Sequence, residues 1–236
     1  MIMIPRPASD KRELLSRHFL LKDLDVRTLD RIVHYSLVRS VSEGSVIFSQ
    51  GDLGECLYGI LRGRVRIFNN SPENREILLN ILEPGALFGE IALLDDRPRT
   101  ANASAMEDCE LLTMHRQHFI PLLEEDPRLA IHMLGLLCAR VRWTSSIIED
   151  TAFLNLPARF AKRLLALAHS HGEKLPDGER IRINLRLSQR QIGAMIDASR
   201  EAVNKQIQIW RADGILDLDD GFLVLRRPDW LEAIVG

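Results

Sequence analysis

The spacing of apolar residues changes early in the chain. From Asp10 to about Ser36 they recur at helical intervals, which predicts one or two short helices. From Val38 to Leu112 they form short runs separated by Gly, Pro, Asn and Asp, a pattern typical of strands and turns. The runs are Val46–Phe48, Leu57–Leu61, Val65–Phe68, Ile77–Leu82 and Glu110–Met114. Strands this short and frequent predict a sandwich or barrel of the jelly-roll kind.

A longer helical pattern follows the strand region. A small helix is expected around Gln117–Glu125, and a long one from about Pro127 to Phe153. In the long helix, one stripe of apolar and hydroxyl residues recurs at alternating intervals of three and four positions. Its members are Leu134, Leu137, Val141, Thr144, Ile148 and Thr151. This a/d seam predicts the spine of a parallel homodimer. The alternative is that the same stripe packs against the chain's own sandwich.

The chain then turns into a second helical region. Phe153 to Pro157 is expected to be a hinge, because the residue before a proline is extended and Pro157 suits the first turn of a new helix. Asn155 or its neighbour would cap that helix. We expect it to run over Ala158–Ala168 and to end before a turn-rich segment, His169–Gly178.

Two capped helices follow, separated by a three-residue turn. Ser188 is expected to cap Gln189–Ile196, with Gln191 as its capping-box partner. Ser199 is expected to cap a helix from Arg200 to about Ala212, with Val203, Ile207 and Trp210 facing inward. Ile215–Leu218 and Phe222–Leu225 predict a hairpin wing. The spacing predicts a helix-turn-helix whose second helix enters the major groove; the alternative is an ordinary helical hairpin.

Charge is distributed unevenly along the chain. The whole chain has a net charge of −2, but residues 157–211 carry eleven Lys and Arg against five Asp and Glu. A basic block inside an acidic chain is expected of a DNA-binding module. Arg and Lys suit guanine edges, and Glu suits cytosine. The candidate DNA-binding residues are Ser188, Gln189, Ser199, Arg200, Glu201, Asn204 and Lys205.

Several other classes of protein are disfavoured. No run of 18 apolar residues exists, so no membrane span or membrane partner is expected. Three widely spaced cysteines indicate reduced thiols in a cytoplasm rather than a disulfide framework. The histidines lack the partners of a metal site, and no P-loop, nucleophile elbow or zinc-hydrolase motif appears. An enzyme is therefore the least expected class.

The run from Phe88 to Ala101 combines groups that suit a phosphate and a sugar. Gly89 lets the backbone approach a ligand closely, and the N–H groups that open the following short helix favour an anion. The Arg99 guanidinium can donate two charge-assisted hydrogen bonds to a phosphate, and the Glu90 carboxylate can accept from ribose hydroxyls. The alternative is a surface turn in which Arg99 pairs with a neighbouring aspartate, Asp95 or Asp96.

This run closely resembles the phosphate-binding cassette of cyclic-nucleotide-binding domains. From about Leu14 to Leu225 the chain resembles the cyclic-AMP receptor protein family of bacterial transcription regulators. The resemblance implies that Glu90 binds the ribose 2′-hydroxyl, that Arg99 and the Gly89 region hold the cyclic phosphate, and that Thr100 touches phosphate or base. The pair Thr144 and Ser145 matches residues that bind the purine in that family, one from each subunit. The candidate ligand-binding residues are thus Gly89, Glu90, Ile91, Ala92, Arg99, Thr100, Thr144 and Ser145.

The start of the second helix, Ser199-Arg200-Glu201, resembles the family's recognition helix for a TGTGA-like half-site. Two residues depart from the family pattern. Asp197 stands in the tight turn where glycine is usual, and it must accept a left-handed conformation. Lys205 replaces the usual arginine and cannot form a bidentate pair of hydrogen bonds with one base. We therefore expect weaker sequence preference at the base that it contacts.

The predicted fold class is α+β. We expect a jelly-roll cyclic-nucleotide-binding domain with N-terminal helices at 1–126, a dimerisation helix at 127–153 and a winged helix-turn-helix domain at 154–236. The expected function is a cytoplasmic homodimeric regulator that binds a palindromic DNA site, responds to cyclic AMP without a metal, and meets RNA polymerase. Thr100 resembles cyclic-GMP-selective domains, so cyclic GMP is the alternative ligand. Two further alternatives are a family regulator with another effector or none, and a cyclic-nucleotide-binding interaction subunit that does not bind DNA.

Overall fold

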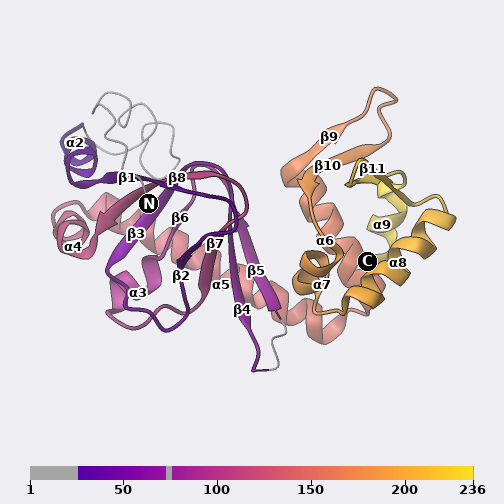
Figure 1. The fold of residues 1–236 in the computed structure, drawn as a ribbon, viewed down its shortest axis with the longest axis horizontal. Helices are drawn as coiled ribbons and strands as arrows, with labels where there is room; N and C mark the ends of the chain where they lie inside the picture. The colour runs from indigo at the N-terminus through magenta and orange to yellow at the C-terminus, as the bar shows by residue number, and fades with distance from the viewer. Residues whose placement is uncertain (1–25, 73–75, 236) are drawn as a thin grey trace. The chain divides into compact units, whose positions relative to one another are not determined.

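The structure is a computed structural model that describes residues 26–72 and 76–235 (Figure 1). The helical segment expected before residue 26 lies outside this range. The described residues form two compact units. Of the described residues, 26–70 and 78–141 form the N-terminal unit, and 71–72, 76–77 and 142–235 form the C-terminal unit.

The N-terminal unit contains two four-stranded sheets. The first has the order β1 (Leu37–Val41), β8 (Cys109–His115), β3 (Cys56–Arg62) and β6 (Leu87–Phe88). The second has the order β2 (Val46–Phe48), β7 (Asn102–Ala105), β4 (Val65–Asn70) and β5 (Glu76–Leu82). One core cluster combines buried side chains from both sheets, including Ile60, Val65, Phe88, Ala103 and Leu111. This interleaved order is that of a jelly roll, so the predicted fold class is confirmed.

Helices cover the other face of the first sheet. They are α2 (Val26–Tyr35), α3 (Glu90–Asp95), α4 (Arg116–Glu125) and the first part of α5 (Pro127–Phe153). A second core cluster joins them to the sheet, with Ile32, Leu93, Phe119, Leu122 and Leu129 among its buried members.

The buried stripe of α5 differs from the predicted seam. Leu129 and Met133 are the buried residues of this helix. Leu134, Val141 and Ile148 of the seam are between 60% and 65% exposed in the single chain. The alternative that the seam packs against the chain's own sandwich is therefore wrong, and this apolar stripe is available for a partner.

The C-terminal unit combines four helices with a small sheet. The helices are α6 (Leu156–His171), α7 (Gln189–Ile196), α8 (Arg200–Ala212) and α9 (Pro228–Val235). The sheet has the order β11 (Leu216–Asp219), β12 (Phe222–Leu225), β10 (Ile181–Arg186) and β9 (Gly172–Lys174). The predicted bounds of α7 and of the capped start of α8 are confirmed.

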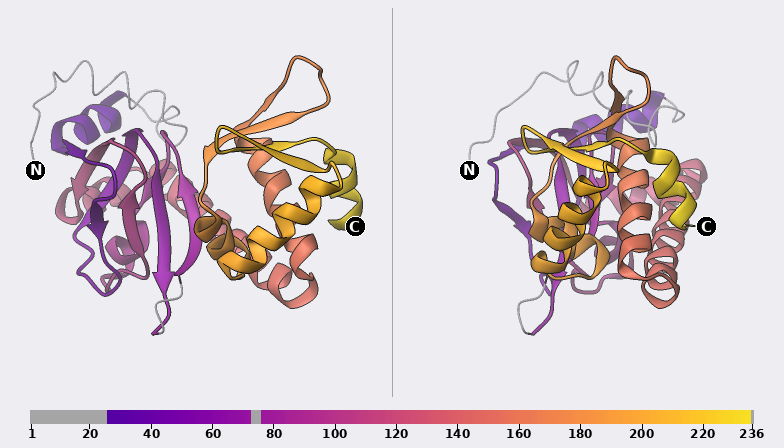
Figure 2. Two further views of the ribbon diagram at one scale, coloured as in Figure 1. Left: turned by 45° about the vertical axis from the view of Figure 1, so that its right-hand side comes forward. Right: turned by 90° about the vertical axis from the view of Figure 1, so that its right-hand side faces the viewer.

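One prediction in this unit is wrong. The segment from His169 was expected to be turn-rich, but α6 continues to His171 and a β9–β10 hairpin follows, which extends from the rest of the unit (Figure 2). No helix-breaking residue occurs before Gly172. The helix ends where Gly172 adopts an extended conformation, and only glycine fits there because a Cβ would lie 2.1 Å from the Ala168 carbonyl oxygen.

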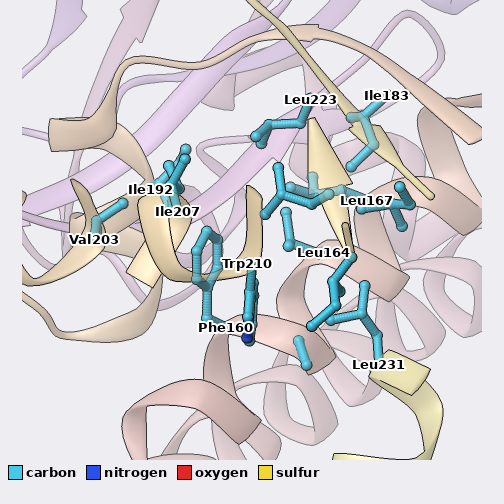
Figure 3. Close-up of a cluster of buried hydrophobic side chains, with 14 of the residues drawn as sticks. Phe160, Leu164, Leu167, Ile183, Ile192, Val203, Ile207, Trp210, Leu223 and Leu231 are labelled. Carbon is cyan, nitrogen blue, oxygen red and sulfur yellow. The ribbon is translucent and has the colours of Figure 1, made fainter. Parts of the chain in front are cut away.

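Stacked aromatic rings occupy the core of the C-terminal unit (Figure 3). The rings of Phe160 on α6 and Trp210 on α8 lie 5.1 Å apart and nearly parallel, and Trp230 meets Trp210 edge-on. Trp210 is fully enclosed by the cluster, which includes Leu164, Ile207 and Leu223. The inward positions predicted for α8 are confirmed.

Replacing Trp210 by Ala should destabilise this unit by about 3–5 kcal/mol, because a large cavity would replace the indole ring. The matched control is Ile209→Ala on the same helix, whose side chain is 43% exposed and whose loss should change stability by about 0.5 kcal/mol. Denaturant unfolding followed by far-UV circular dichroism measures both. Equal losses in the two variants would contradict the packing described here.

Candidate nucleotide and DNA sites

Gly89 lies in the candidate ligand site, where its neighbours leave no room for a side chain. It caps α3 in a left-handed conformation, with φ at 81°. A Cβ at this position would lie 2.7 Å from Nη1 of Arg99 and 3.2 Å from the carbonyl oxygen of Cys56. Both the backbone conformation and the close neighbours therefore require glycine.

Gly89→Ala should weaken nucleotide binding by about tenfold or more, because the added methyl group must displace the Arg99 guanidinium from its place. Gly85→Ala is the matched control, since Gly85 also has a positive φ but nothing lies within 4 Å of its would-be Cβ. Equilibrium titration with cyclic AMP compares the two. Similar losses in both variants would show that backbone strain alone is responsible and would contradict the role given to crowding.

Arg99 lies inside this site rather than on the surface. Its side chain donates from Nη1 to the Gly89 carbonyl and from Nη2 to the Cys56 carbonyl, each over 2.6 Å. Its guanidinium carbon lies 4.3 Å above the Phe48 ring. The alternative of a surface pair with a nearby aspartate is therefore wrong: Arg116 lies 3.8 Å from Asp96 instead.

Arg99 forms no salt bridge among the residues that the structure describes, although the charges of Glu90 and Asp52 are near enough to favour its charged form. The residue is 4% exposed, and its Nε atom is buried without a hydrogen-bond partner. Burial lowers the pKa of Arg99, because the charged form is poorly solvated there. Burying a cation beside two carbonyls and an aromatic ring is costly unless an anion completes the environment. The site therefore has the chemistry of an anion receptor.

Glu90 is joined to the long helix by an arginine. Its side chain is 3% exposed, and Oε1 accepts from Nε of Arg140 over 3.3 Å. Arg140 also donates from Nη2 to the Leu87 carbonyl over 3.0 Å. Sequence reasoning missed Arg140 because it lies off the a/d seam. Its place one turn before Thr144, on the same face of α5, was the available signal.

The remaining candidate ligand residues are divided between the two units. Ala92 is buried beside the site, while Ile91 and Thr100 are exposed. Gly89, Glu90, Ala92 and Arg99 are brought together in the N-terminal unit. Thr144 and Ser145 are exposed residues of α5 and belong to the C-terminal unit.

The two helices of the candidate DNA site are capped as predicted. Ser188 and Gln191 form the reciprocal capping box, and Oγ of Ser199 accepts from the Ala202 amide over 3.1 Å. Asp197 adopts the expected left-handed conformation, with φ at 52°. Helix α7 approaches the turn closely, since a Cβ on Gly193 would lie 2.5 Å from the Ala198 carbonyl oxygen.

The face of α8 opposite the core is polar. Val203, Ile207 and Trp210 are buried, whereas the side chains at the start of the helix that were predicted to contact DNA are exposed, namely Arg200, Glu201, Asn204 and Lys205. This is the arrangement that a recognition helix needs, because the buried face fixes its direction and the exposed face carries hydrogen-bonding groups.

Comparisons with known proteins match both domains. Residues 38–126 match the family of cyclic nucleotide-binding domains, and residues 158–234 match the Crp-like helix-turn-helix domain. The chain is 30% identical to the CRP-like cAMP-activated global transcriptional regulator of Mycobacterium tuberculosis, over 88% of this chain and 92% of the relative. It is 31% identical to the cyclic AMP receptor protein of Thermus thermophilus, over 91% and 95%. The chain belongs to the CRP family of transcription regulators.

Membership in the CRP family decides between several alternatives. The protein is a DNA-binding transcription regulator with a cyclic nucleotide-binding domain, and not an enzyme. The alternative of an ordinary helical hairpin is wrong. The c-di-GMP-responsive global regulator CLP of Xanthomonas campestris shares the CRP fold, with a TM-score of 0.74, 24% identity, and coverage of 85% of this chain and 99% of that one.

Two negative findings apply to residues 26–72 and 76–235. No helix there is both long and apolar enough to cross a membrane. No cluster of three or more His, Cys, Asp or Glu side chains there could hold a metal ion.

Proposed function

We propose that this CRP-family regulator is a homodimer whose affinity for DNA is raised by cyclic AMP. The observation that carries the proposal is the buried Arg99 guanidinium, which has two carbonyl partners, an unpaired Nε atom and no salt bridge in the described part of the chain. A cyclic phosphate supplies the missing negative charge. Its single charge and small size suit a site enclosed by Gly89, Phe48 and Tyr58.

The neighbouring residues suit the rest of a nucleotide. Arg99 and the backbone N–H groups of Glu90, Ile91 and Ala92 would hold the phosphate, and the Glu90 carboxylate would accept the ribose 2′-hydroxyl. Arg140 fixes the direction of the Glu90 carboxylate through its bond to Oε1. The same carboxylate can accept a hydrogen bond from the ribose through Oε2.

The purine would lie against the long helix. The resemblance to the CRP family, in which a hydroxyl pair at this place on the long helix binds the purine, supports this role for Thr144. Ser145 points about 100° away and would meet the ligand of the second subunit. The names of the relatives favour cyclic AMP, while the exposed Thr100 hydroxyl keeps cyclic GMP as the second candidate.

The double variant Thr144→Ala, Ser145→Ala should fold normally but need about tenfold more cyclic AMP for half-maximal DNA binding, since two hydroxyl bonds to the purine are lost. Ser146→Ala, the next hydroxyl on the same helix, is the matched control and should behave as the wild type. A fluorescence-anisotropy titration of labelled duplex measures the required nucleotide concentration. If the double variant needs the same cyclic AMP concentration as the wild type for DNA binding, the assignment of these two hydroxyls is wrong.

The proposed dimer places α5 against the same helix of a second copy. The exposed seam repeats over about two and a half heptads, and its Leu134, Val141 and Ile148 side chains are the most exposed apolar groups of that stripe. Two recognition helices related by a two-fold axis would meet half-sites one helical turn of DNA apart. From the family we also infer a cytoplasmic location and contact with RNA polymerase.

Three cations of α6 hold the last turns of α5. Arg159 donates to the carbonyls of Leu154 (2.9 Å) and Ile196 (3.0 Å), and so joins α5, α6 and α7. Lys162 lies 2.5 Å from Asp150, and Arg163 lies 4.7 Å above the Trp143 ring. We therefore propose that the end of α5 and the recognition helix move as one body. The bend capped by Asn155, which the sequence predicts to be the hinge, would be stiff.

Isothermal titration of the full chain with cyclic AMP and cyclic GMP tests the ligand assignment. We expect one site per chain, with cyclic AMP bound more tightly. Tighter binding of cyclic GMP would make cyclic GMP, rather than cyclic AMP, the expected effector. Absence of binding to both would contradict the proposal and leave a family regulator with another effector.

A further inference from the structure

The exposed face of α8 is joined to the first residue of α7 by a side-chain hydrogen bond. Nε2 of Gln189 donates to Oδ1 of Asn204 over 2.9 Å. Gln189 lies between Ser188 and Gln191, the two residues of the capping box, so its backbone is held in place. Asn204 lies one turn after Arg200 on α8 and is exposed. The two amides therefore form one unit on the surface that is proposed to face DNA.

This bond decides which end of the Asn204 amide is presented to DNA. An asparagine amide has one acceptor oxygen and an NH₂ group with two donors. Because Gln189 already donates to the oxygen, the NH₂ group is the end left for a base edge. Guanine presents two acceptors in the major groove, N7 and O6, whereas adenine presents one acceptor and one donor.

We propose that Gln189 is a positioning residue that makes Asn204 a hydrogen-bond donor to guanine at one base pair of each half-site. The inference rests on the proposed DNA-binding role of α8. Without Gln189, the Asn204 amide could rotate and present either end, and it would then accept adenine and guanine alike. The bond also reduces the side-chain freedom that Asn204 must lose on binding.

Gln189→Glu distinguishes this role from a merely structural one. Glutamate has nearly the shape of glutamine, but an ionised carboxylate only accepts hydrogen bonds. The Asn204 amide must then turn its NH₂ group toward residue 189 and leave its oxygen for the base. We expect the preference at this base pair to move by roughly tenfold from guanine toward adenine or cytosine, which carry major-groove donors. Any loss from the added negative charge near phosphates falls equally on all sequences.

The measurement is a set of anisotropy titrations at fixed salt, with duplexes that carry each of the four base pairs at each half-site position. Asn204→Ala should remove the preference at one position, and this result identifies the position. Gln189→Ala should weaken the preference there without reversing it. The matched control is Gln208→Ala, an exposed amide one turn further along α8, which should leave all preferences unchanged.

Three results would overturn the inference while the proposed function stands: wild-type protein that prefers adenine at the Asn204 position, preferences that are unchanged in Asn204→Ala, or a Gln189→Glu variant that keeps its preference for guanine. A wild-type protein that binds no duplex would overturn the proposed function and this inference together. Circular dichroism of each variant confirms that the helices are intact.

Discussion

Arg99→Met is expected to raise the dissociation constant for cyclic AMP by about a hundredfold or more. Methionine approximates the length of the arginine stem but supplies neither the charge nor the donors for a phosphate. The wild-type guanidinium is buried, and it donates hydrogen bonds to the Gly89 and Cys56 carbonyls. The ligand phosphate would therefore lose its counter-ion in a site where water cannot replace it.

The stability of the unliganded protein should change much less. Removal of the guanidinium leaves the two carbonyls without their donors, which destabilises the fold, but it also removes a buried charge that forms no salt bridge. These effects oppose each other, so we expect a net change of about 1 kcal/mol. Arg97→Ala is the matched control, because Arg97 is an exposed cation two residues away. Calorimetry and thermal unfolding measure the two quantities. Nucleotide binding that survives in Arg99→Met would refute the anion site.

Val141→Glu is expected to convert the dimer into a monomer at micromolar concentration. Val141 is 65% exposed in the single chain and occupies an a position of the seam. In the proposed parallel dimer the two introduced carboxylates would face each other in an apolar interface, where each buried charge costs several kcal/mol. DNA affinity should fall with the dimer, because one recognition helix no longer raises the effective concentration of the other.

Ala139→Glu provides the control for the dimer prediction. Ala139 is exposed on α5 only two residues from Val141, but it lies on the side of the helix away from the seam, so its carboxylate would remain in water. Sedimentation velocity of both variants gives the oligomeric state. A Val141→Glu variant that stays dimeric would exclude the seam as the interface.

Elements with strong local signals were predicted well from sequence. The periodicity of α5 gives both of its ends, and the paired Ser caps give the starts of α7 and α8. Short strands without large apolar side chains were missed. Strand β7 consists of small residues, and Ala103 is buried because this strand lies inside its sheet and Ala103 joins the core that the two sheets share.

The candidate ligand site was predicted in part. Gly89, Glu90 and Arg99 lie close together in the sequence, so their common chemistry is visible there. Their partners are not, because Phe48 and Cys56 reach Arg99 from distant strands and Arg140 reaches Glu90 from α5. Such contacts depend on how the strands and helices pack, and no local pattern records them.

The affinity for DNA with and without nucleotide tests the central claim most directly. The full chain is titrated into a labelled duplex with two TGTGA-type half-sites, at fixed salt, with no nucleotide, with cyclic AMP or with cyclic GMP. We expect cyclic AMP to raise the affinity by about tenfold or more, which corresponds to a coupling free energy of about 1.4 kcal/mol. DNA affinity that is the same under all three conditions would contradict the account.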